Sequence, residues 1–483
     1  MEEKQQSTEE KNDLIEQRYT NLKKLEDAGM NPFGGKFPDT ESVTSVKENF
    51  SEERKVKVAG RIMAKRTMGK SVFMDLKDFT GKIQLYVKKD LIGEEAFNMI
   101  KVLDIGDILG VTGQLFRTRS GEDTIQMSGY TVLAKSLRPL PEKWHGLKDV
   151  EARYRRRYVD LIVNDSARAI FKSRINIIGS IREFLNARGF LEVETPMMHS
   201  IPGGAAGKPF KTHHEALDME LYLRIAPEIY LKKLLVGGFE KVYEINRSFR
   251  NEGISTRHNP EFTMIEVYEA YSDCEGMMEL TEKLIRNAAI KVLGREQFDY
   301  QGKHIDLTEW KRISFEELMK ENYSINVDDP LRVWVEKLKK KGIDVEGDKV
   351  SKTQLLNIVG DLVEPEAETH PVFVVDMFKE LSPLAKEKKD APGITDRFEL
   401  FMGGMEIANA YSELNDPVDQ RKRFIEQVKE DPEAKIDEDF ITALEYGMPP
   451  AGGLGIGIDR LAMLLTDSAS IREVIFFPQM KAE

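Results

Sequence analysis

The chain has 483 residues, a net charge of −12 and a single cysteine, Cys274. The length suits about two or three domains, and the acidic balance argues against a protein that coats nucleic acid with its whole surface, while leaving room for a local basic patch. No apolar run reaches the length of a membrane span, the polar N-terminus lacks the apolar segment of a secretory signal, and the lone cysteine excludes an internal disulfide. We therefore expect a cytoplasmic protein that does not insert into a membrane.

The first 53 residues are predicted to form an N-terminal extension with one amphipathic helix. Over residues 12–28, Leu14, Leu22 and Leu25 mark an apolar face, and Gly29 supplies a stop.

Residues 54–135 are predicted to form a small five-stranded β-barrel. Short alternating segments occur at 56–63, 72–76, 83–87, 108–116 and 124–133, separated by turn sequences. The first hairpin is basic. Five short strands of this kind are typical of the oligonucleotide-binding barrel.

Residues 136–160 are predicted to be a linker, and residues 161–483 a second, mixed α and β domain. Arginines cluster at Arg153, Arg155, Arg156 and Arg157. Such a cluster is more often a solvated face than a binding site, unless a nucleic-acid fold surrounds it. A helix is expected over 166–188, followed by a strand over 190–195, and residues of about 300–370 are predicted to form an inserted helical subdomain.

The densest chemistry lies in residues 250–268, where arginines, a histidine, carboxylates and aromatic rings share one predicted hairpin. A hairpin cannot bury such charges unpaired, so a multiply charged ligand is expected there. Arginine suits phosphate because its guanidinium offers a planar fork of donors. Carboxylates suit an ammonium or a metal. The alternative is a surface loop with solvated ion pairs.

Glycine occupies every second position at Gly453, Gly455 and Gly457, directly before Arg460. This spacing strips one face of a strand of side chains, so a flat ligand or another backbone can approach. It is not the glycine pattern of a dinucleotide-binding turn. The glycines alone also fit a packing strand.

These segments together resemble the three signature motifs of the class II aminoacyl-tRNA synthetases. Phe249-Arg250-Asn251-Glu252 resembles the opening of the second motif, Gly453 to Arg460 the third, and the helix and strand that end at Pro196 the first. The resemblance implies an α+β fold with an antiparallel catalytic sheet, a barrel that reads the anticodon, and a homodimer joined through the first motif.

Further segments resemble the lysine-specific group of this class. They lie at 199–205, 223–228, 381–386 and 406–417. Lys208 and Met377-Phe378 depart from the usual pattern, at positions without an assigned chemical role.

The resemblance implies where ATP would bind. Arg250 would hold the α-phosphate and Arg460 the γ-phosphate. Phe262 would stack under adenine, with Arg460 on its other face. Glu252 would accept a hydrogen bond from the adenine amino group, and Arg257 and His258 would lie near the outer phosphates. The residues assigned to catalysis are Arg250, Glu252 and Arg460. Glu399 and Glu406 would bind Mg²⁺, which prefers carboxylate oxygen.

The resemblance also implies a lysine site. The α-ammonium group would meet Glu228 and the carbonyl of Gly204, and the carboxylate would meet Arg250 and Asn409. The ε-ammonium group would meet Glu266, Tyr268 and Glu413. Glu266 and Tyr268 are two apart on a strand and so share a face.

The implied reaction has two steps. The lysine carboxylate attacks the α-phosphorus of ATP and pyrophosphate leaves, with the enzyme supplying position and charge neutralisation. The lysyl group then passes to the 3′ end of tRNA(Lys). In the barrel, the residues implied to contact the anticodon are Arg66, Phe73, Gln84 and Glu122, with Phe73 stacking on a base. An aromatic residue in a barrel is more often part of the core.

Three alternative functions are compatible with parts of this pattern. An aspartyl or asparaginyl synthetase of the same subclass would need cationic groups around the substrate side chain, where this chain has Glu266 and Glu413. A truncated paralogue that modifies a translation factor would lack the barrel. A non-catalytic RNA-binding relative would be expected to have lost Arg250, Arg460 or the metal carboxylates.

Overall fold

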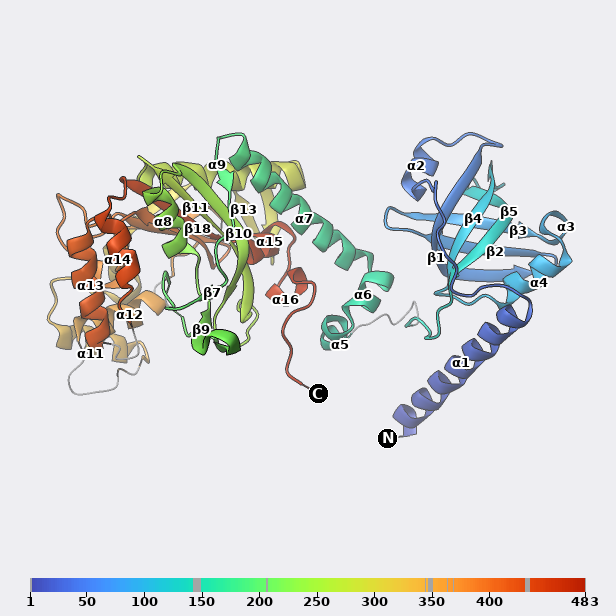
Figure 1. Ribbon diagram of the computed structural model, residues 1–483, viewed down its shortest axis with the longest axis horizontal. Coiled ribbons are helices and arrows are strands. Elements are labelled where there is room, and N and C mark those ends of the chain that lie inside the picture. The colour runs from blue at the N-terminus through green and yellow to red at the C-terminus, as the bar shows by residue number, and fades with distance from the viewer. Residues whose placement is uncertain are drawn as a thin grey trace. The chain divides into compact units, whose positions relative to one another are not determined.

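The structure is a computed structural model that describes residues 2–141, 149–205, 207–343, 345, 351–362, 364–367, 369–430 and 435–482 (Figure 1). The chain divides into two compact units, Met1–Lys148 and Asp149–Glu483. Each unit is described by itself. Within the described ranges, no helix combines the length and apolar character needed to cross a membrane.

The first unit is built on a closed β-barrel, as predicted. Its strands pair in the order β1, β2, β3, β5, β4, and they span Lys55–Met68, Ser71–Lys77, Lys82–Lys88, Asp123–Ala134 and Ile108–Arg117 in that order. Short helices accompany it: α2 (Val43–Glu48), α3 (Lys89–Ile92) and α4 (Glu94–Val102). Every second side chain of a strand points into the barrel and fills its interior, as Val72, Met74 and Leu76 of β2 do.

Helix α1 spans Glu2–Asp27 and begins well before the predicted residue 12. The predicted leucine face is wrong at its start: Leu25 is buried, but Leu14 is 51% exposed. Polar side chains make the contact instead. Arg18 donates hydrogen bonds of 2.8 Å to the backbone oxygens of Ser136 and Ile105, so hydrogen bonds as well as apolar burial hold this helix against the barrel.

The second unit is centred on an eight-stranded sheet with the order β14, β15, β16, β17, β18, β11, β10, β6. These strands span, in that order, Lys311–Ser314, Val372–Val375, Arg397–Met402, Met405–Ser412, Ala451–Gly457, Glu261–Ala270, Lys241–Phe249 and Leu191–Glu192. Only the outermost pairs, β14 with β15 and β10 with β6, are parallel. The predicted antiparallel catalytic sheet is therefore confirmed.

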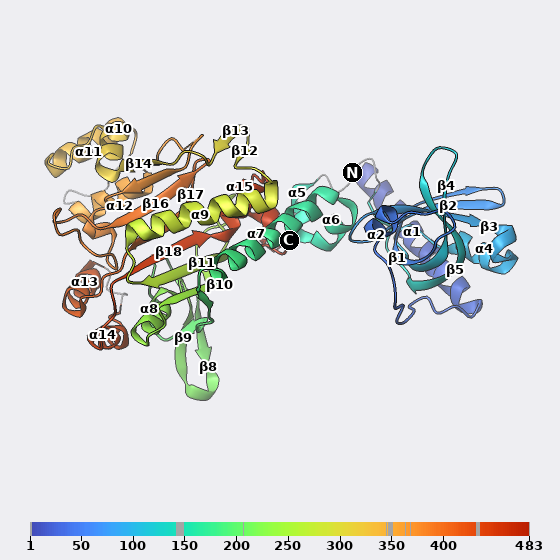
Figure 2. The same cartoon turned by 90° about the horizontal axis from the view of Figure 1, so that it is seen from above.

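Helices cover both faces of this sheet. On one face, α7 (Asp165–Asn186), α9 (Cys274–Leu293) and α15 (Ile458–Leu465) enclose the largest core (Figures 1 and 2). On the other face, α8 (Glu228–Val236) and α14 (Glu438–Glu445) pack against β10 and β11. This second face also carries the candidate site. The remaining helices near these elements are α13 (Pro417–Glu430), α16 (Ile471–Val474) and the 3₁₀ turns Glu215–Leu217 and Lys379–Leu381.

Two small sheets complete the unit: β7 (Met198–His199) with β9 (Met219–Leu223) and β8 (Lys211–His214), and the hairpin of β12 (Gln297–Tyr300) with β13 (Lys303–Asp306).

Within the predicted insertion, α10 (Phe315–Tyr323), α11 (Leu331–Lys340) and α12 (Lys352–Leu362) share their own apolar core with β15. The stretch predicted as a linker contains α5 (Val150–Arg155) and the start of α6 (Arg157–Val163). Helix α5 packs with α6, and α6 packs with α7. Residues 142–148 of that stretch lie outside the described ranges.

Candidate active site

One row of residues crosses the open face of the central sheet. Across β16, β17, β18, β11 and β10, the residues paired in succession are Glu399, Asn409, Gly455, Glu266 and Glu244. Directly paired residues on neighbouring strands point to the same face. The row therefore brings together side chains that the sequence assigned separately to the metal and to the amino acid.

A β-bulge in β17 decides which side chains reach this face. Glu406 and Asn409 are three residues apart, so a regular strand would point them to opposite faces. The register of β17 against β16 shifts because Ile407 is an extra residue. Ile407 is buried in the core on the far face, and Glu406 stays on the same face as Glu399.

The alternate glycines of β18 leave room on this face. A Cβ atom added at Gly453 would lie 1.9 Å from Glu413 Oε1 and 2.7 Å from Tyr268 Cε1. At Gly455 the nearest atom would be Met264 Cε, at 3.4 Å. Gly453 is thus required because Glu413 and Tyr268 occupy the space of its missing side chain. The missing side chain of Gly455 instead leaves space above the sheet that a ligand can fill.

The second motif forms the predicted hairpin of β10 and β11, with Phe249 paired to Glu261. Arg250 follows β10, and its guanidinium carbon lies 5.1 Å from the centre of the Phe262 ring. Burial lowers the pKa of Arg250, and Glu252 opposes that effect. Arg250 Nε is buried without a hydrogen-bond partner among the described residues, as expected for a group that awaits an anion.

Arg460 lies in the first turn of α15 and reaches the loop of the hairpin. Its Nη1 donates to the backbone oxygen of Glu406 at 2.7 Å, and its Nη2 lies 3.2 Å from His258 Nε2. Burial and the nearby Arg460 charge lower the pKa of His258. The structure thus brings Arg460, His258 and Glu406 together, and His258, like Glu252 and Arg257, lies exposed on the loop of the hairpin.

An ion pair that the sequence did not reveal fixes the start of α15. Arg174 of α7 lies 2.5 Å from Asp459 Oδ1, and Asp459 Oδ2 accepts a hydrogen bond of 2.7 Å from the Thr263 backbone. The three predicted motifs are therefore tied together directly beside Arg460.

Gly204 and Glu228, both assigned to the α-ammonium group, lie against each other. Gly204 has φ +88°, and a Cβ atom added there would lie 3.0 Å from Glu228 Cβ. Glycine is needed at this position both for its conformation and for the close approach.

Glu228 and Glu413 share a cation that the sequence reasoning missed. Lys232 Nζ lies 2.5 Å from Glu228 Oε1 and also forms an ion pair with Glu413 Oε2. Tyr411 donates to the same Glu228 oxygen at 2.7 Å. The four-residue spacing of Glu228 and Lys232 on one helix could have predicted their ion pair. The contact of Lys232 with the distant Glu413 could not be predicted in this way.

Glu266 differs from these acids. Tyr268 donates a hydrogen bond of 3.0 Å to Glu266 Oε2, and no cation within the described ranges forms an ion pair with it. Burial, followed by the nearby Glu228 charge, raises the pKa of Glu266 well above its ordinary value. Burial raises the pKa of Glu413 to about 8, with Lys232 opposing.

The two carboxylates assigned to Mg²⁺ each face an arginine. Arg397 donates to Glu399 Oε1 at 2.6 Å and Arg460 to Glu406 Oε2 at 3.2 Å. The described residues contain no group of three metal-ligating side chains. Two carboxylates on one face still fit Mg²⁺, because this ion commonly binds one or two carboxylates together with substrate phosphates.

Of the barrel residues assigned to the anticodon, Arg66 and Glu122 are exposed, Phe73 is partly exposed and Gln84 is buried. Arg66 pairs with Phe73 across β1 and β2, and Gln84 Nε2 donates to Glu122 Oε2 at 3.0 Å. Phe73 points outward and lies 4.9 Å from Tyr86, centre to centre. Tyr86 is a second surface aromatic that the sequence reasoning missed.

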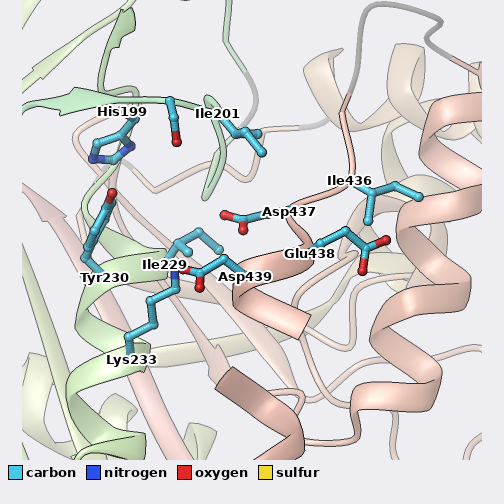
Figure 3. A pocket seen from close by; sticks show the side chains of 10 residues that line it. His199, Ile201, Ile229, Tyr230, Lys233, Ile436, Asp437, Glu438 and Asp439 are labelled. Carbon is cyan, nitrogen blue, oxygen red and sulfur yellow. Dashed lines mark hydrogen bonds and ion pairs between the residues drawn. The ribbon is translucent and has the colours of Figure 1, made fainter. Parts of the chain in front are cut away.

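A cavity of about 260 Å³ lies on a different face of α8 from Glu228 and Lys232 (Figure 3). His199, Tyr230 and Lys233 line one side, and Asp437 and Asp439 at the start of α14 line the other. Its lining residues include none of the predicted site residues, so it is separate from the charged row on the sheet.

Comparison with known proteins agrees with this arrangement. Residues 149–481 match the family of class II tRNA synthetases (D, K and N), and residues 56–140 match the OB-fold nucleic acid binding domain. The chain is similar to the lysine–tRNA ligases of Carboxydothermus hydrogenoformans, at 55% identity over 98% of this chain and 99% of the relative, and of Pelotomaculum thermopropionicum, at 55% over 98% and 96%. The lysine–tRNA ligase of Oceanobacillus iheyensis is 50% identical over 99% of this chain and 100% of the relative. The chain belongs to the class II tRNA synthetases, in the group of the lysine–tRNA ligases.

Proposed function

We propose that this protein activates L-lysine with ATP and transfers it to the 3′ end of tRNA(Lys). The observation that carries the choice of lysine is the charge of the buried pocket. Its buried carboxylates outnumber its buried cations by two, within the described residues: the acids are Glu228, Glu244, Glu266 and Glu413, and the cations are Arg224 and Lys232.

L-Lysine supplies the two missing positive charges. Buried charges are stable only when they are paired, and lysine carries an α-ammonium and an ε-ammonium group. We assign the α-ammonium to Glu228 and Gly204, and the ε-ammonium to Glu266, Tyr268 and Glu413. An aspartyl or asparaginyl substrate would leave at least one acid unpaired, which disfavours both alternatives.

The first step needs no nucleophile from the protein. Arg250 and Asn409 would orient the lysine carboxylate toward the α-phosphorus of ATP, and Arg250 would neutralise charge that develops there. Arg460, His258 and Arg257 would hold the departing pyrophosphate, while Phe262 and Glu252 would bind adenine. In this proposal, Arg250, Arg460 and Glu252 remain the catalytic residues.

Mg²⁺ fits the carboxylates Glu399 and Glu406, and when bound it supplies positive charge at the ATP phosphates. Arg397 and Arg460 would hold these two side chains in place.

The barrel would bind the anticodon through Arg66, Phe73, Gln84 and Glu122. A surface aromatic flanked by polar side chains suits an unstacked base. A homodimer through α7 and β6 also belongs to this proposal, and the exposed apolar side chains of Ile175 and Leu191 support it. We place the enzyme in the cytoplasm.

Aminoacylation of a tRNA(Lys) transcript tests the proposal. The protein should attach lysine to the transcript in an ATP-dependent reaction, and periodate oxidation of the terminal ribose should abolish acceptance. A transcript with a changed anticodon should accept less lysine. Failure to charge tRNA(Lys) with any amino acid would reject the proposal.

A further inference from the structure

Lys232 is a fully enclosed cation beside the site. Its side chain is fully buried on α8, with the rings of Tyr411 and Phe440 at 5.5 and 5.8 Å from Nζ. Although burial opposes the charge, Glu228 and Glu413 together raise its pKa above the ordinary lysine value. The two carboxylates therefore favour the charged form of Lys232.

Lys232 contacts one carboxylate oxygen of each of two acids. It meets Glu228 through Oε1 and Glu413 through Oε2. Tyr411 also uses Glu228 Oε1. Neither oxygen of Glu413 has a hydrogen-bond partner among the described residues, and Oε2 is the one that the Lys232 charge approaches, which leaves Oε1 free. That free oxygen points toward Gly453, where a Cβ atom would collide with it. Lys232 thus holds each of the two carboxylates through one of its oxygens.

We propose that Lys232 is a positioning residue for amino-acid recognition: it anchors one oxygen of Glu228 and one of Glu413, and so aims the other oxygens at the two ammonium groups of the substrate. Lys232 also sets the charge of the pocket, because without it a third buried acid would lack a partner. This inference rests on the proposed function, since it assumes that Glu228 and Glu413 bind the amino acid.

A positioning role predicts a selective defect. Without the anchor, Glu228 and Glu413 repel each other or take up a proton, and in either case bind ammonium less well. The ATP residues Arg250, Phe262 and Arg460 make no recorded contact with Lys232, so ATP binding should be preserved. A residue needed only for folding would instead lower the active fraction and leave both KM values unchanged.

Chemical rescue makes the test specific. Lys232→Ala removes three carbons and an ammonium, which n-propylammonium reproduces. The variant should lose about 100-fold or more in kcat/KM for lysine in ATP–pyrophosphate exchange, with KM for ATP nearly unchanged. Added n-propylammonium should restore much of this loss, whereas 1-propanol should not. The same amine should fail to activate the unmodified enzyme.

Two further variants keep the test decisive. Lys232→Met preserves volume without charge, and should show the same selective loss even if Lys232→Ala does not fold. Lys233→Met is the matched control, because Lys233 pairs with the exposed Asp439 on another face of the helix. Normal lysine activation by Lys232→Met, or an equal rise of both KM values, would overturn the inference. If the unmodified enzyme fails to activate lysine, the proposed function falls instead.

Discussion

Glu266 and Glu244 face each other across β11 and β10, yet their buried carboxylates have different partners. Glu244 forms an ion pair of 2.7 Å with Arg224, whereas Glu266 meets only the Tyr268 hydroxyl among the recorded hydrogen bonds of the described residues. Arg224 thus neutralises Glu244, whereas Glu266 has no cation as a partner among the described residues. Glu266 can therefore bind a cation of the substrate. Glu266 is therefore the acid that we propose as the main contact of the ε-ammonium group of lysine.

The first prediction concerns that contact. Glu266→Gln keeps the shape and a hydrogen bond to Tyr268 but removes the charge. Losing one partner of a buried charged hydrogen bond costs about 2–5 kcal/mol, so lysine-dependent exchange should fall by about 1.5 to 3.5 decades at unchanged KM for ATP. The exposed Glu261 of the same strand provides the control Glu261→Gln, which should exchange normally. Normal lysine activation by Glu266→Gln would contradict the assignment.

The second prediction concerns pH and stability. Burial raises the pKa of Glu266 well above the ordinary glutamate value of 4.5. Between these two pKa values, the folded protein without lysine holds a proton that the unfolded chain has released. Stability from this group therefore falls as the pH rises above about 4.5 toward the raised pKa. Glu266→Gln should increase Tm more at pH 8 than at pH 5 in thermal melts without substrate. An equal change in Tm at pH 5 and pH 8 would contradict a raised pKa for the buried Glu266 carboxyl.

Lysine binding should also release protons, which is the third prediction. An arriving ammonium group favours the ionised forms of Glu266 and Glu413, so protons leave as lysine binds. Calorimetric titration in buffers of different ionisation enthalpy should report this release near pH 7, and Glu266→Gln should reduce it. The absence of any proton release would show that these acids are already ionised in the empty site.

The alternating glycines allow a fourth prediction. Gly453→Ala places a methyl group against Glu413 and Tyr268, and overpacking of this kind costs about 1–3 kcal/mol. Both the free energy of unfolding and lysine activation should suffer. Gly455→Ala meets only ordinary contacts, so it should fold normally in urea titrations and yet raise the KM of a substrate. Equal stability of the two variants would contradict the different roles of these glycines.

The fifth prediction concerns the barrel. Phe73→Ala should weaken charging of tRNA(Lys) by about 1–3 kcal/mol, the cost of one lost base stack, and leave pyrophosphate exchange intact. Phe79→Ala, at the turn after β2, is the control because Phe79 is 70% exposed outside the Phe73–Tyr86 pair. Equal losses in both reactions would mark Phe73 as a structural residue.

Local pattern was sufficient to predict the barrel, the hairpin of the second motif and the bare face of β18. These features depend on periodicity and turns, as in the two-residue spacing of Glu266 and Tyr268. Contacts between distant segments were beyond that reasoning. Glu406 and Asn409 share a face only because Ile407 forms a bulge, and Lys232 reaches Glu413 only once α8 is packed against the sheet.

The polar face of α1 shows the same limit. Leucine spacing pointed to Leu14, but the backbone oxygens of Ser136 and Ile105 become available only when the barrel has formed. Hydrogen bonds from Arg18 then determine which side of the helix is buried. Such a choice depends on tertiary partners and carries no periodic signal.

ATP–pyrophosphate exchange with each of the twenty amino acids, in the absence of tRNA, tests the central claim most directly. A pocket that lacks two positive charges should activate L-lysine far faster than any other amino acid, with no exchange above background for aspartate or asparagine. Preferential exchange with aspartate, asparagine or an uncharged amino acid, or no exchange with any of the twenty, would contradict the account of the buried acids as a receptor for two ammonium groups.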